Sequence, residues 1–406
     1  MEQNKKTPQI RFKEFTDDWE QRKLGEIANV YDGVHQTPNY QDNGIMFLSV
    51  ENISTLKSEK YISDEDFRRY YKVYPEQGDI LMTRIGDVGT TNVVENSEKI
   101  AFYVSLALLK PINTNPYFLS NAMKTNDFQK GLRERTLVTA IPQKINKDEI
   151  GKVELFITCN FREQTKIGEY FRNLDHLITL HQRKYEKLIN MKKSLLEKMF
   201  PENGSLYPKI RFKGFTDDWE QRKAVDIADY SKGNGYSKSD LKETGTPIIL
   251  YGRLYTKYQF AITEVDTFAT PKDGSVYSQG NEVLIPASGE TAEDIARASA
   301  VEKSGVLLGG DLNIIRPFNF INPLFLALTI SNGEPQKELA KKAQGKSVVH
   351  IHNADIQKVS VSFPTRAEQD QIVSMFRNLD NLITLHQRKL EKLKNIKKSL
   401  LEKMFL

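Results

Sequence analysis

Two stretches of the chain carry mainly apolar side chains at alternating intervals of four and three residues. In the first stretch these positions are Leu174, Ile178, His181, Tyr185, Leu188, Lys192, Leu195 and Met199. In the second they are Leu379, Ile383, His386, Leu390, Leu393, Lys397, Leu400 and Met404. This spacing is typical of helices that pack along a common seam, here with a histidine and a lysine as polar interruptions in each. The sequence therefore predicts two long helices that pack on each other.

Both predicted helices have recognisable starts. Asn160 is a predicted N-cap followed three positions later by Glu163, and Thr365 with Glu368 forms a predicted capping box. No proline interrupts residues 161 to 200, and Pro201 then ends the first helix. The helices are expected over residues 161–200 and 366–406, where about 40 residues at 1.5 Å each would span about 60 Å.

The helical stretches are two copies of one sequence. Residues 171–200 and 376–405 agree at 26 of 30 positions, and the head PQIRFKEFTDDWEQRK at 8–23 returns as PKIRFKGFTDDWEQRK at 208–223. Between these copies the chain diverges almost completely. A repeat of about 200 residues is too long for a solenoid, so two halves related by a pseudo-two-fold axis are expected, with antiparallel helices. Phe12, Phe15 and Trp19 of the head, like their copies, are predicted to be structural.

The segments between head and helix, residues 24–155 and 224–360, contain short β-rich runs broken by Gly, Asn and Pro. They are predicted to be α+β domains. Despite their divergence they share landmarks, such as Asn115-Pro116 and Asn322-Pro323, which are predicted to open a helix. One fold with two different surfaces is the expected arrangement.

The exposed helix positions match as well as the seam positions do. His181-Gln182-Arg183-Lys184 returns as His386-Gln387-Arg388-Lys389. Core packing constrains apolar residues and says little about outward ones. The matching surfaces therefore indicate one shared site for identical partner subunits, with recent duplication and sequence exchange as the alternative.

Charge gathers on the helices. The net charge of the chain is +5. Residues 171–200 hold seven Lys/Arg against three Asp/Glu, and residues 376–405 hold eight against three, so together they carry +9 and the remainder carries −4. Such a run is either a solvated helix face or a contact with phosphate or with an acidic protein surface.

Complete catalytic motifs are missing from the sequence. Gly345-Lys346-Ser347 supplies only the end of a phosphate-binding loop, and Asn115-Pro116-Tyr117 lacks the second proline of the adenine methyltransferase motif. The only cysteine, Cys159, excludes a disulfide, and no HExxH pair indicates a metal site. With no apolar run of about 20 residues and no apolar leader, a cytoplasmic protein without a membrane segment is expected.

Taken together, these motifs resemble the specificity subunit of type I restriction-modification systems. The resemblance covers essentially all 406 residues and rests on the duplicated FTDDWEQRK heads, the EQ-x-x-I helix entries at Glu163 and Glu368, and the LITLHQRK helices. Asp32-Gly33-Val34-His35 and the run from Gly78 to Gly86 also fit. The family usually has proline before the EQ entry, which Pro364 matches and Cys159 does not.

The resemblance implies a non-catalytic DNA-binding subunit of α+β class. Two target-recognition domains, residues 1–160 and 201–365, would be separated by the two antiparallel helices, and each would bind one half of a split, asymmetric site in double-stranded DNA. Two methyltransferase subunits would bind the helices and bring S-adenosylmethionine for adenine-N6 methylation. Two motor-nuclease subunits would bring ATP and Mg²⁺, and the chain itself would hold no cofactor or metal.

Base edges are read by side chains that reach from loops or helices into the major groove. The predicted DNA-binding residues are His35, Gln36, Asn52, Arg84 and Lys144 in the first domain, and Tyr251, Arg253, Ser288, Lys346 and His350 in the second. A single-chain restriction or methylation enzyme and a coiled-coil adaptor for proteins remain as alternative functions.

Overall fold

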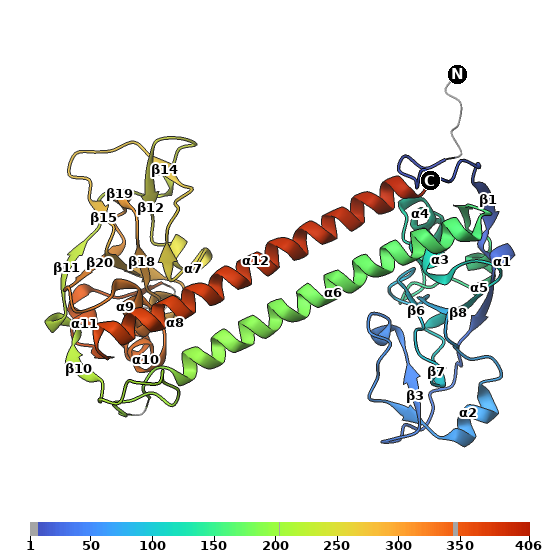
Figure 1. Cartoon of the computed structure of the whole chain (residues 1–406), viewed down its shortest axis with the longest axis horizontal. Helices are drawn as coiled ribbons and strands as arrows, with labels where there is room; N and C mark the ends of the chain where they lie inside the picture. The colour runs from blue at the N-terminus through green and yellow to red at the C-terminus, as the bar shows by residue number, and fades with distance from the viewer. Residues whose placement is uncertain (1–6, 203, 344–347) are drawn as a thin grey trace. The chain divides into compact units, whose positions relative to one another are not determined.

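The computed structural model describes residues 7–202, 204–343 and 348–406. The chain divides into two compact units, which are described separately (Figure 1). Unit 1 contains the residues up to Arg183 together with His386–Leu406, and unit 2 contains Lys184–Leu385. Each unit therefore holds one variable segment and a part of both long helices, because the division falls inside each helix.

Both long helices form as the apolar spacing predicts. Helix α6 runs from Phe161 to Lys198 and helix α12 from Arg366 to Met404. The Asn160 side chain accepts the backbone N–H groups of Arg162 and Glu163, at 3.1 and 3.3 Å. The predicted N-cap at Asn160 is therefore confirmed.

Unit 1 is built on two small sheets. Its strands are β1 (Glu20–Lys23), β2 (Ala28–Asp32), β3 (Ile45–Leu48), β4 (Tyr61–Ile62), β5 (Ile80–Thr83), β6 (Thr91–Val93), β7 (Ile100–Phe102), β8 (Leu106–Pro111) and β9 (Glu154–Ile157). Its shorter helices are α1 (Leu24–Ile27), α2 (Asp64–Tyr70), α3 (Pro116–Ala122), α4 (Asn126–Arg135) and α5 (Lys147–Gly151), with a 3-10 turn at Val50–Asn52. One sheet has the strand order β2-β8-β5-β6 and the other β4-β3-β7, while β1 pairs antiparallel with β9.

Unit 2 repeats this plan with longer sheets. Its strands are β10 (Glu220–Lys223), β11 (Ala228–Lys232), β12 (Thr246–Ile249), β13 (Ala261–Ile262), β14 (Phe268–Ala269), β15 (Tyr277–Gln279), β16 (Glu282–Pro286), β17 (Ser288–Gly289), β18 (Ser299–Val301), β19 (Ser304–Leu308), β20 (Leu312–Pro317), β21 (Val349–His350) and β22 (Ser360–Phe363). Its shorter helices are α7 (Arg253–Thr256), α8 (Ala292–Ile295), α9 (Pro323–Ile330), α10 (Gly333–Lys342) and α11 (Asn353–Ile356), with 3-10 turns at Ala224–Asp226 and Lys238–Asp240. The sheet orders are β11-β20-β16-β18-β13 and β14-β12-β19-β15, and β10 pairs with β22 as β1 pairs with β9.

The divergent segments thus share one α+β fold, and the predicted fold class is confirmed. The Asn-Pro landmarks open helices α3 and α9, as predicted. Asn115 accepts the backbone N–H groups of the two residues after Pro116, and Asn322 does the same after Pro323. A capping side chain and a proline in the first turn are enough to start a helix in either sequence context.

Each head is held against the end of a long helix by its tryptophan. In unit 1 the Trp19 ring lies 5.6 Å from that of Phe118 and 5.9 Å from that of Phe405, beyond the end of α12. In unit 2 Trp219 lies 5.6 Å from Phe325 and 6.2 Å from Phe200, beyond the end of α6. Both tryptophans are fully buried, so the predicted structural role of the heads is confirmed.

The backbone repeats this contact in both units. The Ile10 N–H donates to the carbonyl of Lys403 at 2.8 Å, and the Ile210 N–H donates to that of Lys198 at 2.9 Å. In unit 2 the hydrogen-bonded residues Lys198 and Ile210 are close in sequence. In unit 1 the hydrogen-bonded residues Ile10 and Lys403 are far apart in sequence, because the head that precedes the first domain contacts the end of the second long helix.

Polar side chains meet along the seam within each unit. In unit 1 Lys397 binds Asp175 at 2.5 Å and the Nδ1 atoms of His181 and His386 lie 2.8 Å apart. In unit 2 Lys192 binds Asp380 at 2.5 Å. Asp175 contacts Lys397 and the later residue His181 contacts the earlier residue His386, so the segments of α6 and α12 in unit 1 run antiparallel.

We predict that Phe405→Ala will lower the free energy of unfolding of unit 1 by about 3 kcal/mol, because it leaves a cavity beside Trp19. The chain has only two tryptophans, one in each unit, so Trp19 fluorescence in a Trp219→Phe background reports urea unfolding of unit 1. Phe161→Ala is the matched control, since Phe161 is 55% exposed. An equally small effect of both substitutions would contradict the proposed importance of this contact.

Candidate nucleic-acid interface

A buried arginine holds three loops of unit 1 together. Arg84 follows strand β5, and its guanidinium forms an ion pair with Asp32 at the end of β2. Its Nε also donates to the carbonyl of Ile145 at 3.0 Å. The Arg84 side chain is nearly inaccessible, and burial lowers its pKa from the ordinary value. The loops that begin at Gly33 and Ile85, and the loop that ends at Ile145, are therefore fixed at one edge of the domain.

Two of the predicted DNA-binding residues in unit 1 form hydrogen bonds within their own domain. Arg84 contacts Asp32 and Ile145. The Asn52 amide is also occupied, because its oxygen accepts the Ser49 N–H at 2.9 Å and its nitrogen donates to the Lys57 carbonyl at 2.9 Å. Both side chains hold turns, and DNA binding by them stays a prediction.

The other three predicted residues of unit 1 are exposed on the loops that Arg84 fixes. His35 and Gln36 follow β2. Lys144 forms β-bridges to Ile85 and Leu137 through its backbone, which leaves its side chain in solvent. The structure thus places these three side chains on loops anchored by one ion pair.

In unit 2 the structure brings two predicted residues into contact. Strand β17 pairs with β21, and the Ser288 hydroxyl lies 3.0 Å from Nδ1 of His350. Ser288 is buried and His350 is exposed. Lys346, the third predicted residue of this region, lies outside the described residues.

The two remaining predicted residues of unit 2 are Arg253 and Tyr251, and Arg253 belongs to an ion cluster with Asp266 and Lys257. Nη1 of Arg253 lies 2.5 Å from the Asp266 carboxylate, and its Nη2 donates to the Glu264 carbonyl at 2.9 Å. Lys257 and Arg253 together lower the pKa of Asp266 to about 2. Arg253 therefore holds the α7 region through these contacts, and DNA binding by its side chain stays a prediction. Tyr251 is half-buried against the adjacent apolar core.

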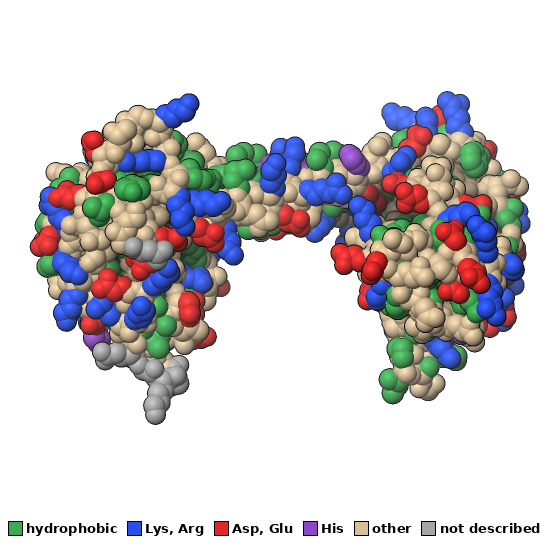
Figure 2. Space-filling model, turned by 90° about the horizontal axis from the view of Figure 1, so that it is seen from below, with side chains coloured by type: hydrophobic (Ala, Val, Ile, Leu, Met, Phe, Trp, Pro, Cys, Tyr) green, Lys and Arg blue, Asp and Glu red, His purple; other side chains and the backbone are tan. Residues whose placement is uncertain are grey.

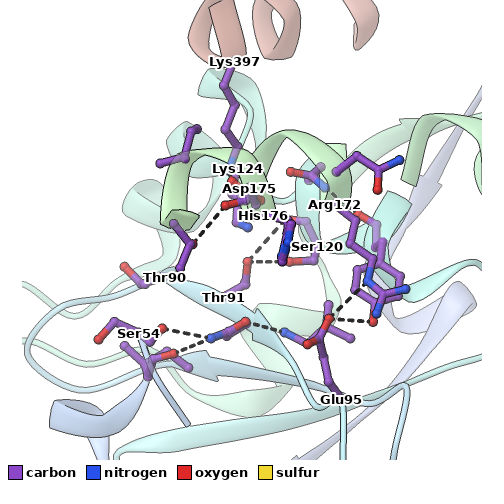
Figure 3. Close-up of a pocket in the computed structure, with 18 of the residues that line it drawn as sticks. Ser54, Thr90, Thr91, Glu95, Ser120, Lys124, Arg172, Asp175, His176 and Lys397 are labelled. Atoms are coloured by element: carbon purple, nitrogen blue, oxygen red, sulfur yellow. Dashed lines mark hydrogen bonds and ion pairs between the residues drawn. The ribbon is translucent and has the colours of Figure 1, made fainter. Parts of the chain in front are cut away.

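A polar cleft of about 720 Å³ lies between strand β6, helix α3 and helix α6 of unit 1 (Figure 3). Thr90, Thr91 and Ser120 form one wall, and Arg172 and His176 of α6 form another. The Thr91 and Ser120 hydroxyls are 3.0 Å apart. Among the residues predicted to bind DNA or a partner, only Arg183 lines this cleft.

Most charges in the cleft are paired. Glu95 accepts hydrogen bonds from Tyr117 at 3.0 Å and from Nε of Arg172 at 3.2 Å, and Asp175 binds Lys397. Lys124 differs, because burial and, to a smaller extent, nearby Lys397 lower its pKa to about 8 while Asp175 opposes the shift. The lining thus holds four cations, Lys124, Arg172, Arg183 and Lys397, against the two carboxylates of Glu95 and Asp175, a positive balance that suits a phosphate group.

Lys124 is one of 58 lysines and arginines, and no local sequence pattern marks it. Its environment depends on residues distant in sequence, among them Asp175 and Lys397. Unit 2 has a smaller cleft of about 350 Å³ with the equivalent pairs Arg377 with Glu302 and Lys192 with Asp380.

The comparison with known families agrees with this duplicated plan. The family model for the type I restriction modification DNA specificity domain matches residues 16–190 and again residues 216–395. One match falls on each copy of the repeat, and together they span most of the chain. The chain belongs to this family.

Similar members include two specificity subunits of Methanocaldococcus jannaschii. The MjaVIII subunit is 21% identical over 66% of this chain, an alignment that spans 65% of its own length, just under two thirds. The putative MjaX subunit is 24% identical over 96% of this chain and 93% of its own length. The solved S subunit of a type I restriction-modification system from M. genitalium has the same fold, with a TM-score of 0.59 at 14% identity over 98% of this chain and 99% of that one. The resemblance predicted from the sequence is confirmed.

The helix faces of this specificity-domain protein differ from the prediction at two positions. His181 and His386 face each other across the seam, which confirms the seam positions predicted for them and removes them from the outward face. Gln182 is half-buried. Five of the eight predicted partner-binding residues are exposed, namely Arg183, Lys184, Gln387, Arg388 and Lys389.

Apolar side chains lie next to these cations on the helices. Leu177 and Leu180 are 43% and 38% exposed in unit 1, and their copies Leu382 and Leu385 are 43% and 45% exposed in unit 2. Figure 2 shows apolar and basic side chains side by side along the helices. The LITL motif occurs at residues 177–180 and again at 382–385. The sequence did not predict exposure of these leucines, because they lie beside the seam positions and not on them.

In residues 7–202, 204–343 and 348–406 no cluster of three or more His, Cys, Asp or Glu side chains could hold a metal ion. No helix in these ranges is long and apolar enough to cross a bilayer. Cys159 is exposed.

We predict that Lys124→Met will raise the free energy of unfolding of unit 1 at pH 7 by about 1–2 kcal/mol. The pKa of Lys124 falls from 10.5 to about 8 on folding, so the unfolded chain holds the proton more tightly. The resulting penalty is complete below pH 8 and disappears as the pH rises toward 10.5. Urea unfolding at pH 7 and pH 9.5 should show the gain shrinking, with exposed Lys130→Met as the control. A gain that is equal at both pH values would contradict a burial penalty on this ammonium.

Proposed function

We propose that this chain is the DNA-recognition subunit of a type I restriction-modification complex and that each unit reads one half of a split, asymmetric site. The observation that carries this proposal is the contrast between repeated and unrepeated surfaces. The heads, helix ends and seam are nearly identical in the two units, whereas the loops at the domain edge carry different residues. A scaffold that repeats while its loops differ suits recognition of two unlike DNA sequences.

The exposed loop residues have chemistry suited to base edges. Gln36 in unit 1 can pair bidentately with adenine, and Lys144 can donate to guanine or to phosphate. In unit 2 the contact of His350 Nδ1 with Ser288 orients the imidazole and leaves Nε2 for a base or a phosphate oxygen. His35 and Tyr251 are proposed as further contacts, and Lys346 stays a prediction. The polar cleft beside Lys124 would hold backbone phosphate.

The chain itself is proposed to be non-catalytic. Two methyltransferase subunits would supply S-adenosylmethionine and adenine-N6 chemistry, and two motor-nuclease subunits would supply ATP-driven translocation and Mg²⁺-dependent cleavage. Incomplete cofactor motifs in the sequence support this division over a single-chain enzyme. The divergent loops support it over a coiled-coil adaptor, because an adaptor for proteins alone needs no pair of unlike domains.

The methyltransferase subunits are proposed to bind the repeated helix faces. Each face combines an exposed leucine pair, Leu177 with Leu180 or Leu382 with Leu385, with the neighbouring cations of the HQRK motif. An apolar centre with a charged rim is the usual composition of a protein interface. The matching sequences of these faces on α6 and α12 support binding of two identical subunits.

The first test exchanges residues 24–155 for the corresponding segment of another family member. Methylome sequencing of cells that express the chimera with its methyltransferase should show a split motif in which one half has changed and the other is unchanged. An exchange of residues 224–360 should change the opposite half. If either exchange altered both halves, or if methylation were independent of the chain, recognition by separate units would be refuted.

The second test concerns the partner faces. Leu177→Ser with Leu180→Ser should remove one methyltransferase subunit from the complex in native mass spectrometry, and the same change at Leu382 and Leu385 should remove the other. Ile189→Lys is the matched control, because Ile189 is 39% exposed and its copy is already Lys394. Retention of both subunits in the fourfold variant would exclude these leucines as the interface.

A further inference from the structure

The loop that joins α4 to Lys144 exposes three apolar side chains within five residues. The exposed fractions of Leu137, Val138 and Ile141 are 45%, 70% and 99%. These residues, 137–141, are called the apolar tip. Single exposed apolar side chains are common, but a projecting group of them marks a surface that another molecule covers.

The base of the apolar tip is held by a ladder of backbone hydrogen bonds. The Leu137 N–H donates to the Lys144 carbonyl at 2.8 Å, and the Gly86 N–H donates to the Gln143 carbonyl at 2.8 Å. The Gln143 side chain returns a hydrogen bond to the Gly86 carbonyl at 2.9 Å. Arg84 then fixes Ile145 directly behind the ladder. A fixed base means that the tip loses little conformational freedom when it binds.

The chain on both sides of the tip is strongly basic. Residues 130–147 contain five cations and one acid, Glu134, which gives a net charge of +4. The cations are Lys130, Arg133, Arg135, Lys144 and Lys147, and all except the half-buried Arg135 are exposed. This charge is complementary to a polyanion.

We propose that the apolar tip inserts between adjacent base pairs of the first half-site while the flanking cations contact phosphates. This inference rests on the proposed function and adds deformation of the DNA to it. Aliphatic side chains that enter a base step unstack it and bend the duplex, which lets the protein contact more of the backbone. Ile141, the most exposed of the three, is the inserting residue, with Val138 beside it.

The occupant is DNA because the chain on both sides of the tip is basic, with a net charge of +4 over residues 130–147. A polyanion is attracted to such a surface, and phosphate contacts made by the flanking cations would set the position of the tip on the duplex. The sequence of the tip, LVTAI, differs from the sequence of unit 2 before Val348, as expected for a surface that meets a different half-site.

The test uses the full chain assembled with its methyltransferase subunits. Once the split motif is known, 2-aminopurine is placed at each step of the first half-site in turn. The wild-type complex should raise its fluorescence severalfold at one step, because an unstacked 2-aminopurine is no longer quenched. Ile141→Ser with Val138→Ser should abolish this rise and weaken target binding by about tenfold or more, since the bend is lost. Ile141→Leu should retain both.

Val73→Ser is the matched control, since Val73 is an exposed valine of the same domain and is 36% exposed. Ile141 is almost fully exposed, so its removal disturbs no packing, and equal thermal melting of all variants verifies this. Unchanged fluorescence in the wild type at every step would overturn insertion even though sequence-specific binding persists. Loss of methyltransferase subunits from the double variant would overturn it as well, by assigning the tip to a protein contact. If the proposed function itself were wrong, the wild-type complex would bind no specific sequence, and this result is distinguishable from the two outcomes above.

Discussion

The rest of the structure depends on the contact between each head tryptophan and the phenylalanine that follows a long helix. Trp19 packs on Phe405 and Trp219 on Phe200, with a backbone hydrogen bond beside each contact. In unit 1 this interaction fixes the end of α12 against the domain from which α6 starts. In unit 2 it fixes the end of α6 against the domain from which α12 starts. Each domain therefore completes its core with residues from both helices. The nearly invariant heads and tails follow from this requirement, because a change on one side would have to be matched on the other.

A second repeated contact sets the start of each helix. Glu163 is fully buried and receives two hydrogen bonds from Arg11, at 2.6 and 2.9 Å, and Glu368 receives two from Arg211, both at 2.8 Å. The neighbouring glutamines are buried too, and Gln164 and Gln369 each accept a backbone N–H from the residue that caps α3 or α9. Buried charges and amides of this kind must be fully paired, which ties head, domain and helix into one geometry. The EQ entry is therefore a structural motif.

The repeats made the fold predictable. Helix spacing and N-caps are local or periodic signals that predict the long helices, and the short β-rich runs predict the α+β class. The loop residues were predictable only in part. His35, Gln36 and Lys144 are exposed as expected, whereas the donor groups of Arg84, Asn52 and Arg253 form hydrogen bonds within their own domains. Whether an arginine points to solvent or binds an aspartate distant in sequence depends on tertiary contacts, and the burial of Lys124 was hidden for the same reason.

The hydrogen bonds of Ile10 to Lys403 and of Ile210 to Lys198 have a topological consequence. Phe200 and Ile210 are joined by a short continuous segment, whereas the equivalent positions in unit 1 are the two ends of the sequence. A head follows the end of a long helix at two equivalent places. The chain is continuous at one of them, between α6 and the second head, and is open at the other, between α12 and the first head. Moving the opening from one place to the other would leave the packing of both units unchanged. Opening both would give two half-length chains, each with one head, one domain and one helix, that regain every contact by association. If such halves were identical, their loops would be identical too, and the asymmetry of recognition would be replaced by symmetry.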